Sequence, residues 1–135
     1  MTASAEETLR DYYEALRRGE PLYPYFAERE DVVKVGVGER LVGYDAVAEG
    51  LREQTRTTDD WTVESREPRV AEQGDCAWFA DRVRMAWTAV DAEREYDVDA
   101  RWSGTLSRRH ALEGRAAAGD EWLFVGMRVS VPHGN

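Results

Sequence analysis

A period-two alternation of apolar and polar residues, which runs from Trp61 almost to the C-terminus, constrains the fold more than any other feature. This period is typical of β-strands whose two faces meet different surroundings. We expect four strands, over residues 61–70, 76–90, 96–109 and 122–131. Pro68 indicates a bulge or an edge position, and the small residues of 111–120 indicate a loop before the last strand. Strands of 10 to 15 residues are longer than usual, so the sheet is expected to twist and curl strongly.

Helical signals occupy the first half of the chain. Ser4 and Glu7 have the spacing of a capping box, and Gly19 ends the helix that follows. The apolar stripe of this helix has the spacing i, i+3, i+4, i+7 and consists of Leu9, Tyr12, Tyr13 and Leu16. A β-hairpin is expected over 32–42, and a second helix begins after Gly43.

Helices followed by a long antiparallel meander describe a single α+β domain. We expect this domain to span residues 1–135, with an ordered core from about 6 to 132. Its N-terminal helices would pack on a strongly curved antiparallel or mixed sheet. Helices that lie across the concave side of such a sheet enclose a cone-shaped pocket, which is the natural place for a ligand.

Charge narrows the range of partners. The chain has 18 basic and 27 acidic side chains, a net charge of −9, and its basic residues are 17 arginines and Lys34. An acidic surface repels phosphate backbones, so nucleic acid is not expected as a partner. A carboxylate-rich surface almost without lysine resembles the surfaces of halophilic acidic proteins, which lose stability when salt is diluted. A GC-rich genome would also explain the scarcity of lysine, although not the net charge.

Other features bear on the location of the protein and on cofactors. No stretch approaches the roughly 20 apolar residues that cross a bilayer, so no membrane span is expected. The N-terminus lacks the basic and apolar parts of a signal peptide, and a single cysteine forms no internal disulfide; both favour the cytoplasm. His110 and His133 have no second ligand at metal spacing, so we expect no metal site. Gly36-x-Gly38 is followed by a hairpin rather than a helix, so it is not a dinucleotide-binding motif, and we expect no organic cofactor.

Four segments carry a resemblance to a known family. They read Val-Gly-Tyr-Asp-Ala-Val at 42–47, Ala-Trp-Phe-Ala-Asp at 77–81, Arg-Trp-Ser-Gly-Thr-Leu at 101–106 and Trp-Leu-Phe-Val at 122–125. Together with the order of elements, they resemble the SnoaL-like branch of the nuclear transport factor 2-like superfamily, from about Glu6 to Pro132. The resemblance implies the cone-shaped fold and, commonly, a dimer. It leaves the function open, because this fold hosts isomerases, cyclases, dehydratases, binding modules and assembly domains.

The strongest candidate for a functional side chain lies on the expected strand 76–90. Alternation puts on one face the residues Phe79, Asp81, Val83, Met85 and Trp87. This face is apolar except for Asp81, and a lone carboxylate there must be paired, hydrogen-bonded or protonated. Asp81 is interpreted either as a pocket base and polar anchor for a ligand, or as the partner of a buried arginine.

Arg101 and Arg128 are the expected cationic partners. Arg101 lies on the strand expected to pair with that of Asp81, and Arg128 shares a face of the last strand with Ser130. The resemblance implies that position 128 faces the pocket, because relatives often carry a histidine there in a His-x-Ser pattern. An inward guanidinium would bind a ligand carboxylate in a bidentate fork. Alternation leaves open whether Arg101 or Trp102 faces the pocket, because a bulge would reverse the faces.

The last strand also suggests an interface. Its face opposite Arg128 is apolar and consists of Leu123, Val125, Met127 and Val129. If this face lies on the outside of the sheet, it would be covered by a second copy of the chain. We therefore expect a homodimer that forms through the outer face of the sheet.

Three functions fit these residues. The first is binding of a small organic molecule, carboxylate-bearing if an arginine faces it, in a mixed apolar and polar pocket. Its ligand-binding residues would be Asp81, Arg128, Arg101, Trp102, Tyr12, Tyr13, Phe79, Met85 and Ser130. The second is a cofactor-independent isomerase, dehydratase or cyclase with Asp81 as general base and the Tyr13 phenol beside the enolate, as a ketosteroid-isomerase-like mechanism requires. The third is a dimerisation or interaction module whose own side chains fill the pocket.

Overall fold

The computed structural model describes residues 4–113 and 120–132. The helical elements are α1 (Ala5–Arg18), the 3₁₀ turn η1 (Tyr23–Tyr25), α2 (Tyr44–Thr57) and α3 (Arg109–Glu113). The strands are β1 (Val33–Gly36), β2 (Glu39–Val42), β3 (Thr58–Ser65), β4 (Arg69–Gln73), β5 (Cys76–Ala89), β6 (Arg94–Arg108) and β7 (Trp122–Ser130). Among these described helices, none has the length and apolar character needed to cross a membrane.

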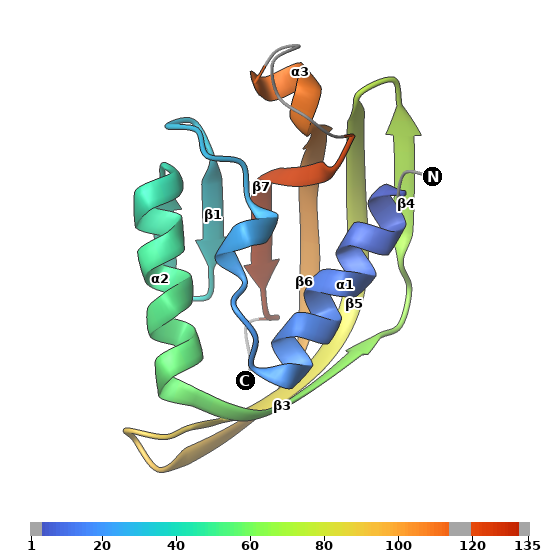
Figure 1. The fold of residues 1–135 in the computed structure, drawn as a ribbon. Coiled ribbons are helices and arrows are strands. Elements are labelled where there is room, and N and C mark those ends of the chain that lie inside the picture. Colours follow the sequence, from blue (N-terminus) through green and yellow to red (C-terminus); the bar gives the residue numbers. More distant parts are fainter. Residues whose placement is uncertain (1–3, 114–119, 133–135) are drawn as a thin grey trace.

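The described strands form one curved sheet. Its order is β2-β1-β7-β6-β5-β3, and β4 also pairs with β5. β1 runs parallel to β7 and the other pairs are antiparallel, so the sheet is mixed. Both long helices lie across one face, α1 in front of β5 and α2 beside β1, and the joined ends of β5 and β6 bend beneath α2 (Figure 1). The predicted α+β fold, with N-terminal helices on a strongly curved sheet, is confirmed.

Local sequence signals set the bounds of α1. The Ser4 hydroxyl accepts a hydrogen bond from the Glu7 amide at 3.0 Å, and the Glu7 carboxylate accepts one from the Ser4 amide at 3.3 Å, which confirms the capping box. Gly19 ends the helix with a φ of 69°, in the left-handed region that favours glycine. Between these ends, the predicted apolar stripe is buried: Leu9, Tyr12, Tyr13 and Leu16.

Alternation along the sheet sorts residues between the core and the outer face. In β5, every second residue from Ala77 to Met85 is buried, and the residues between them are exposed. The buried face of β5 packs against α1 and the aromatic core. The same face therefore carries both the hydrophobic core and the candidate site.

The first expected strand, 61–70, is two strands in the structure. Pro68 falls between β3 and β4, where it supplies no amide to the sheet, and both strands pair with β5. A bulge is present, but it lies between Asp59 and Thr62 rather than at the proline. The other position expected for Pro68, an edge of the sheet, is confirmed, because β3 and β4 each pair only with β5.

The expected loop over 111–120 begins as a helix. α3 extends from Arg109 to Glu113, consistent with the strong helix propensity of the Ala-Leu-Glu sequence at its end. Residues 114–119 of this stretch lie outside the described part of the chain. The loop prediction is therefore wrong for residues 111–113, whereas Asp120 lies outside any helix or strand.

Candidate functional site

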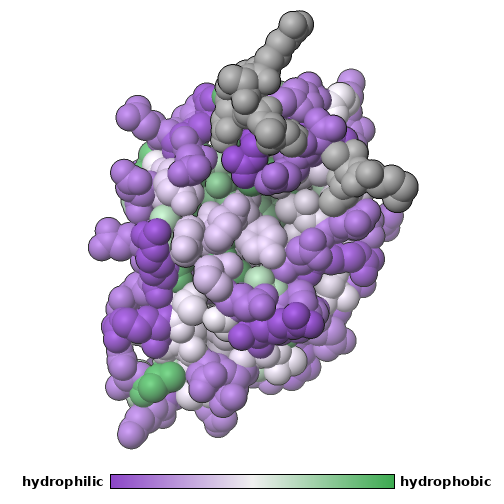
Figure 2. Space-filling view, viewed as in Figure 1, coloured by the Kyte–Doolittle hydropathy of each residue, from purple (hydrophilic) through white to green (hydrophobic). Residues whose placement is uncertain are grey.

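A cavity of about 330 Å³ lies between the two long helices and the inner face of the sheet. α1 contributes Tyr12 and Leu16, and α2 contributes Gln54 and Thr57. The sheet contributes mostly apolar and aromatic side chains: Trp61, Met85, Trp87, Trp102 and Val129. On the helix-bearing side of the molecule, less hydrophilic side chains gather inside a hydrophilic rim (Figure 2). The cavity lies on the side of the sheet where a pocket is expected.

One ion pair faces this cavity. Lys34 of β1 is 5% exposed, and its ammonium donates to the Glu39 carboxylate of β2 at 2.8 Å. Glu39 stands directly across the hairpin from Gly36, where an added Cβ would lie 2.7 Å from the carboxylate oxygen. The missing side chain at Gly36 therefore leaves room for the carboxylate of Glu39 to reach Lys34. Glu39 is itself solvent-accessible, so the pair joins the buried cavity to the surface.

A stack of aromatic rings forms the wall beside β3. Trp61 lies opposite Trp87 of β5, one position beyond the pair Thr62–Ala86, and their rings stack with centroids 4.7 Å apart. Trp87 stacks in turn on Tyr96 at 5.1 Å. Asp60, within the bulge, has a φ of 54°, a conformation that a non-glycine residue adopts only when its surroundings hold it there. Alternation with Val63 puts Trp61 on the inner face, and the bulge lies at the end of this aromatic wall.

Trp102 of β6 forms the inner end of the cavity. Its ring contacts Tyr12 and Tyr13 edge-on, with centroids 5.9 Å and 5.2 Å away. Its indole nitrogen is buried, and within residues 4–113 and 120–132 it has no hydrogen-bond partner. Unpaired buried donors are uncommon, so this N–H is a polar group that an incoming molecule or water would satisfy.

Asp81 lies on the inner face, 4% exposed, as the alternation predicts. Its carboxylate accepts hydrogen bonds from the Tyr13 hydroxyl at 2.9 Å, the Ser65 hydroxyl at 2.6 Å and the Glu67 amide at 3.0 Å. These donors come from α1, from β3 and from the segment between β3 and β4. Asp81 does not line the 330 Å³ cavity. Asp81 therefore links α1, β3 and the connection between β3 and β4. This differs from both roles expected from the sequence, a pocket base or ligand anchor and the partner of a buried arginine.

The predicted cationic partners of Asp81 are on the other face. Arg101 pairs across strands with Arg82 and with Ser130, and all three are exposed. Arg128 is also exposed, whereas Trp102 beside Arg101 is buried. The expectation that Arg128 and Ser130 face the pocket is therefore wrong, and of the two faces left open for the strand of Arg101, that of Trp102 is the inner one. Alternation separates two faces but does not say which is the inner one, and the burial of Trp102 decides it.

The apolar face expected on the outside of β7 is not found there. Met127 and Val129 are buried on the inner face. A register shift in the pairing of β6 with β7 puts Phe124, not Leu123, on that face, and Leu123 is itself buried, so these residues offer no outer surface to a second copy. The exposed side of this part of the sheet carries Arg101 and Arg128 instead. A homodimer that forms through the outer face of the sheet stays a prediction. The apolar face of β7, from which it was inferred, no longer supports it.

Among the other predicted ligand-binding residues, Tyr12, Met85 and Trp102 line the cavity. Phe79 packs in the core against Phe124, and Tyr13 is engaged with Asp81. A role in binding stays a prediction for the residues that line the cavity. For Phe79 and Tyr13 the structure indicates packing and support.

Sequence reasoning missed Lys34 and Glu39. A signal was present, because Lys34 is the only lysine of the chain and stands inside a run of valines, Val32, Val33 and Val35. A charged residue in such a run needs a partner if its strand is buried. The partner, five residues away across a hairpin, could be found only with the register of the hairpin known.

Burial keeps two phenols of the site protonated. Desolvation raises the pKa of Tyr12 well above its usual range, and the nearby charge of Glu39 adds to this. The pKa of Tyr13 is raised further, by desolvation and then by the charge and hydrogen bond of Asp81. Both side chains are therefore hydrogen-bond donors, not phenolates, at any neutral pH.

These shifts predict a loss of stability in alkali. A tyrosine in the unfolded chain ionises at about pH 10, whereas Tyr12 and Tyr13 in the folded chain stay protonated to higher pH. Their contribution to the free energy of unfolding is therefore complete below about pH 10 and is lost as the pH rises above it. The free energy of unfolding should fall above pH 10 by about 1.4 kcal/mol per pH unit for each tyrosine. Denaturant melts at a series of pH values measure this slope. In Tyr13→Phe the free energy of unfolding should fall less steeply with pH above about pH 10. An unchanged slope would contradict a raised pKa of Tyr13 in the folded chain.

The fold and the cavity together define a class: an α+β cone domain with a ligand-sized hollow between its helices and its sheet. Residues 5–132 match the family model of the SnoaL-like domain, and the chain belongs to this family. No curated protein matches the chain.

Solved structures with the same fold come from several bacteria. A nuclear transport factor 2-like superfamily protein of Salmonella enterica has a TM-score of 0.76 at 15% identity, over 95% of this chain and 88% of the other. A proposed dehydratase of Streptomyces avermitilis has a TM-score of 0.77 at 15% identity, over 96% and 94%. A ketosteroid isomerase-like protein of Erwinia carotovora has a TM-score of 0.73 at 19% identity, over 96% and 94%. At these identities the likeness concerns the fold alone.

Proposed function

We propose that the protein binds a small, flat organic molecule in the cavity between α1, α2 and the sheet. The observation that carries this proposal is a hollow of about 330 Å³ with aromatic walls, onto which the ion pair of buried Lys34 and solvent-accessible Glu39 opens. Ligand cavities combine mostly apolar walls with a few polar groups that fix orientation, and this volume is at the small end of their range. A molecule about the size of a bicyclic aromatic compound suits it.

The polar groups favour a neutral ligand that carries an oxygen. Lys34 is the cation of the lining, and it is already paired with Glu39. A carboxylate-bearing ligand would have to displace Glu39, whereas a hydroxyl or carbonyl oxygen can accept a further N–H of the ammonium without breaking the pair. The carboxylate expected from the sequence depended on Arg101 and Arg128, which lie on the outer face.

Quenching of tryptophan fluorescence by 2-naphthol tests the proposal, because three of the five tryptophans line the cavity. In Val129→Phe the added ring occupies the hollow, and we expect the affinity to fall about tenfold or more, a change of about 1.4 kcal/mol in binding free energy. Val42→Phe, at an exposed position outside this cavity, is the matched control and should bind as the wild type does. Equal affinity of both variants would contradict binding in the cavity. Tighter binding of 2-naphthoate than of 2-naphthol would favour the carboxylate-bearing ligand.

A cofactor-independent isomerase or dehydratase is the second candidate, and one observation favours it. The Glu39 carboxylate, a possible proton acceptor, and the protonated Tyr12 phenol, a donor, belong to the same cavity. The version that uses Asp81 as the base lacks this support, because three hydrogen bonds hold its carboxylate outside the cavity. Glu39→Gln should abolish turnover if Glu39 is the general base, and Asp81→Asn should abolish it if Asp81 is the general base.

A further inference from the structure

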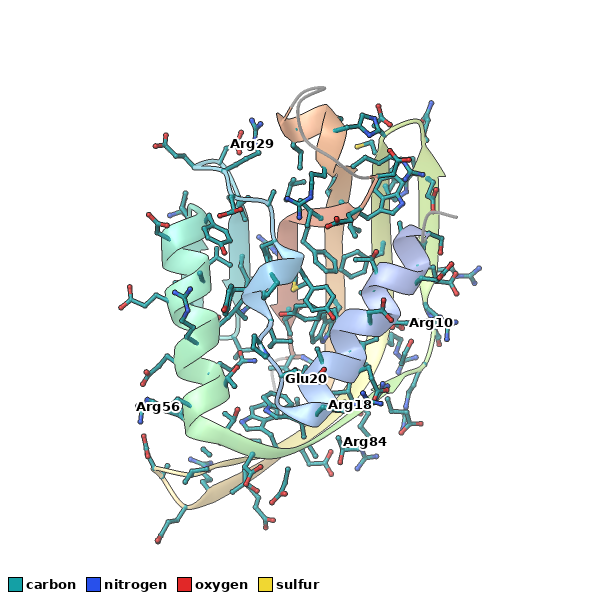
Figure 3. The ribbon with its side chains drawn as sticks, in the orientation of Figure 1. Arg10, Arg18, Glu20, Arg29, Arg56 and Arg84 are labelled. Carbon is teal, nitrogen blue, oxygen red and sulfur yellow. The ribbon has the colours of Figure 1, made fainter. Side chains whose placement is uncertain are left out.

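The single lysine of the chain lies in the cavity. Of the 18 basic residues, 17 are arginines, and Lys34 is the exception. Arginines labelled in Figure 3 lie around the outside of the molecule, and surface carboxylates pair with Arg10, Arg18, Arg29, Arg56 and Arg84. A sequence whose other basic side chains are all guanidinium groups therefore keeps its one side-chain amine at the cavity.

The surroundings of Lys34 leave its amine accessible to a ligand. Only one hydrogen bond of its ammonium, to Glu39 at 2.8 Å, is found within the described residues. An ammonium has three donors, so two remain. The hairpin register places Lys34 and Glu39 on the same side, where the Glu39 side chain lies over Gly36, and both belong to the cavity lining.

Guanidinium and amine differ in one chemical respect that matters here. Both carry a positive charge and both pair with carboxylates, but an amine that gives up a proton becomes a nucleophile, whereas arginine does not lose its proton in proteins. Lysines in apolar pockets attack carbonyl carbons to form Schiff bases. A charge-pairing role alone gives no reason to retain lysine in a chain with so strong a preference for arginine.

We infer that Lys34 is a covalent binding site for an aldehyde or ketone carried by an aromatic ligand, with Glu39 as its proton acceptor and donor. This inference depends on the proposed function, because the ligand must first enter the cavity. It specifies the class of ligand: a flat aromatic compound with a reactive carbonyl group.

The proposed reaction is a condensation that needs no oxidant or reductant. Glu39 takes a proton from the Lys34 ammonium, and the nitrogen lone pair then attacks the carbonyl carbon. The C–N bond forms as the carbonyl π pair moves to oxygen, and transfer of a proton from nitrogen to that oxygen gives a carbinolamine. Glu39 returns its proton to the hydroxyl, the C–O bond breaks and water leaves. The product is an iminium ion beside the Glu39 carboxylate, with the same net charge as the starting ion pair.

Reductive trapping tests this directly in the intact protein. The protein is incubated with 2-naphthaldehyde and cyanoborohydride, which converts an iminium into a stable secondary amine, and the adduct is located by mass spectrometry. The chain has no other lysine, so the N-terminal amine is the internal reference. Trypsin no longer cleaves after a modified Lys34, so residues 30–40 should appear as one labelled peptide.

The rate decides between a reactive site and a merely exposed amine. We expect Lys34 to be labelled at least about tenfold faster in the folded protein than in the urea-unfolded chain, because only the folded cavity binds the aldehyde and places Glu39 beside the amine. Glu39→Gln should slow labelling by about 100-fold. Labelling that is no faster in the folded chain, or that is unaffected in Glu39→Gln, would overturn the inference.

The labelling and quenching of the wild-type protein separate the inference from the proposed function. Lys34→Arg keeps the positive charge beside Glu39 but has no side-chain amine, so it should form no adduct at position 34. If the wild-type protein is quenched by 2-naphthol and 2-naphthaldehyde but Lys34 is not labelled, the covalent step is wrong and binding in the cavity stands. If neither compound quenches and no adduct forms, the proposed function is wrong as well.

Discussion

Asp81→Ala is expected to lower the free energy of unfolding by about 3 kcal/mol or more. The substitution removes the acceptor of three hydrogen bonds and leaves the Tyr13 hydroxyl, the Ser65 hydroxyl and the Glu67 amide without it. A buried donor that loses its partner costs about 1–3 kcal/mol, and the effects of neighbours add only in part. Denaturant-induced unfolding of the purified variant measures the change.

A graded series gives this prediction its controls. Tyr13→Phe removes one donor and keeps the carboxylate, so it should cost less, about 1 kcal/mol. Asp97→Ala removes an exposed carboxylate that pairs with Arg84 at the surface, and we expect little change. If Asp81→Ala were no less stable than Asp97→Ala, Asp81 would not hold α1 and β3 to β5. A folded Asp81→Asn protein should bind 2-naphthol as the wild type does.

Gly104→Ala is expected to be destabilising to a similar extent, by about 3 kcal/mol. A Cβ at this position would collide with the Gly126 carbonyl oxygen, and it would lie 2.8 Å from Phe79 Cε1 and 3.2 Å from Met127 Cα. Two of these contacts are with backbone, which cannot turn aside as a flexible side chain can. β6 and β7 must therefore separate locally, and the aromatic core beneath them must repack.

Gly126→Ala is the matched control for this change. An added Cβ at Gly126 meets nothing within 4 Å. We expect its free energy of unfolding to stay within about 0.5 kcal/mol of the wild-type value, because the added methyl group enters open space. Thermal or denaturant melts of the two alanine variants compare them under one condition. Equal stability would mean that β6 and β7 do not approach as closely at Gly104 as the structure has them.

Much of the fold could be predicted because its signals are local. The capping box at Ser4 and the left-handed cap at Gly19 depend on neighbouring residues, and the alternation around Asp81 depends on one strand. The orientation of β6 and β7 depends on which of two amphipathic faces packs on the helices. Both faces contain polar and apolar residues, so alternation identified the pairs Arg101–Trp102 and Arg128–Val129 but not the inner member of each.

The site was less accessible to sequence reasoning, because its parts meet only through the fold. The amide that binds Asp81 belongs to Glu67, in a connection between strands, and a backbone donor has no sequence signature. Trp61 and Trp87 meet because β3 pairs with β5 in the register of Thr62 and Ala86, which the residue pattern does not specify. Lys34 is unusual in the sequence because it is the only lysine, but its position in the cavity lining could be seen only in the fold.

The central claim is that the ligand occupies the cavity bounded by the Lys34–Glu39 pair. ¹³C-methyl methionine NMR during a titration with 2-naphthol tests it most directly. Met85 lines the cavity, whereas Met127 is buried on the same sheet outside it. We predict that the Met85 methyl resonance shifts in proportion to tryptophan quenching while that of Met127 stays in place. Saturated quenching with a stationary Met85 resonance would contradict the claim.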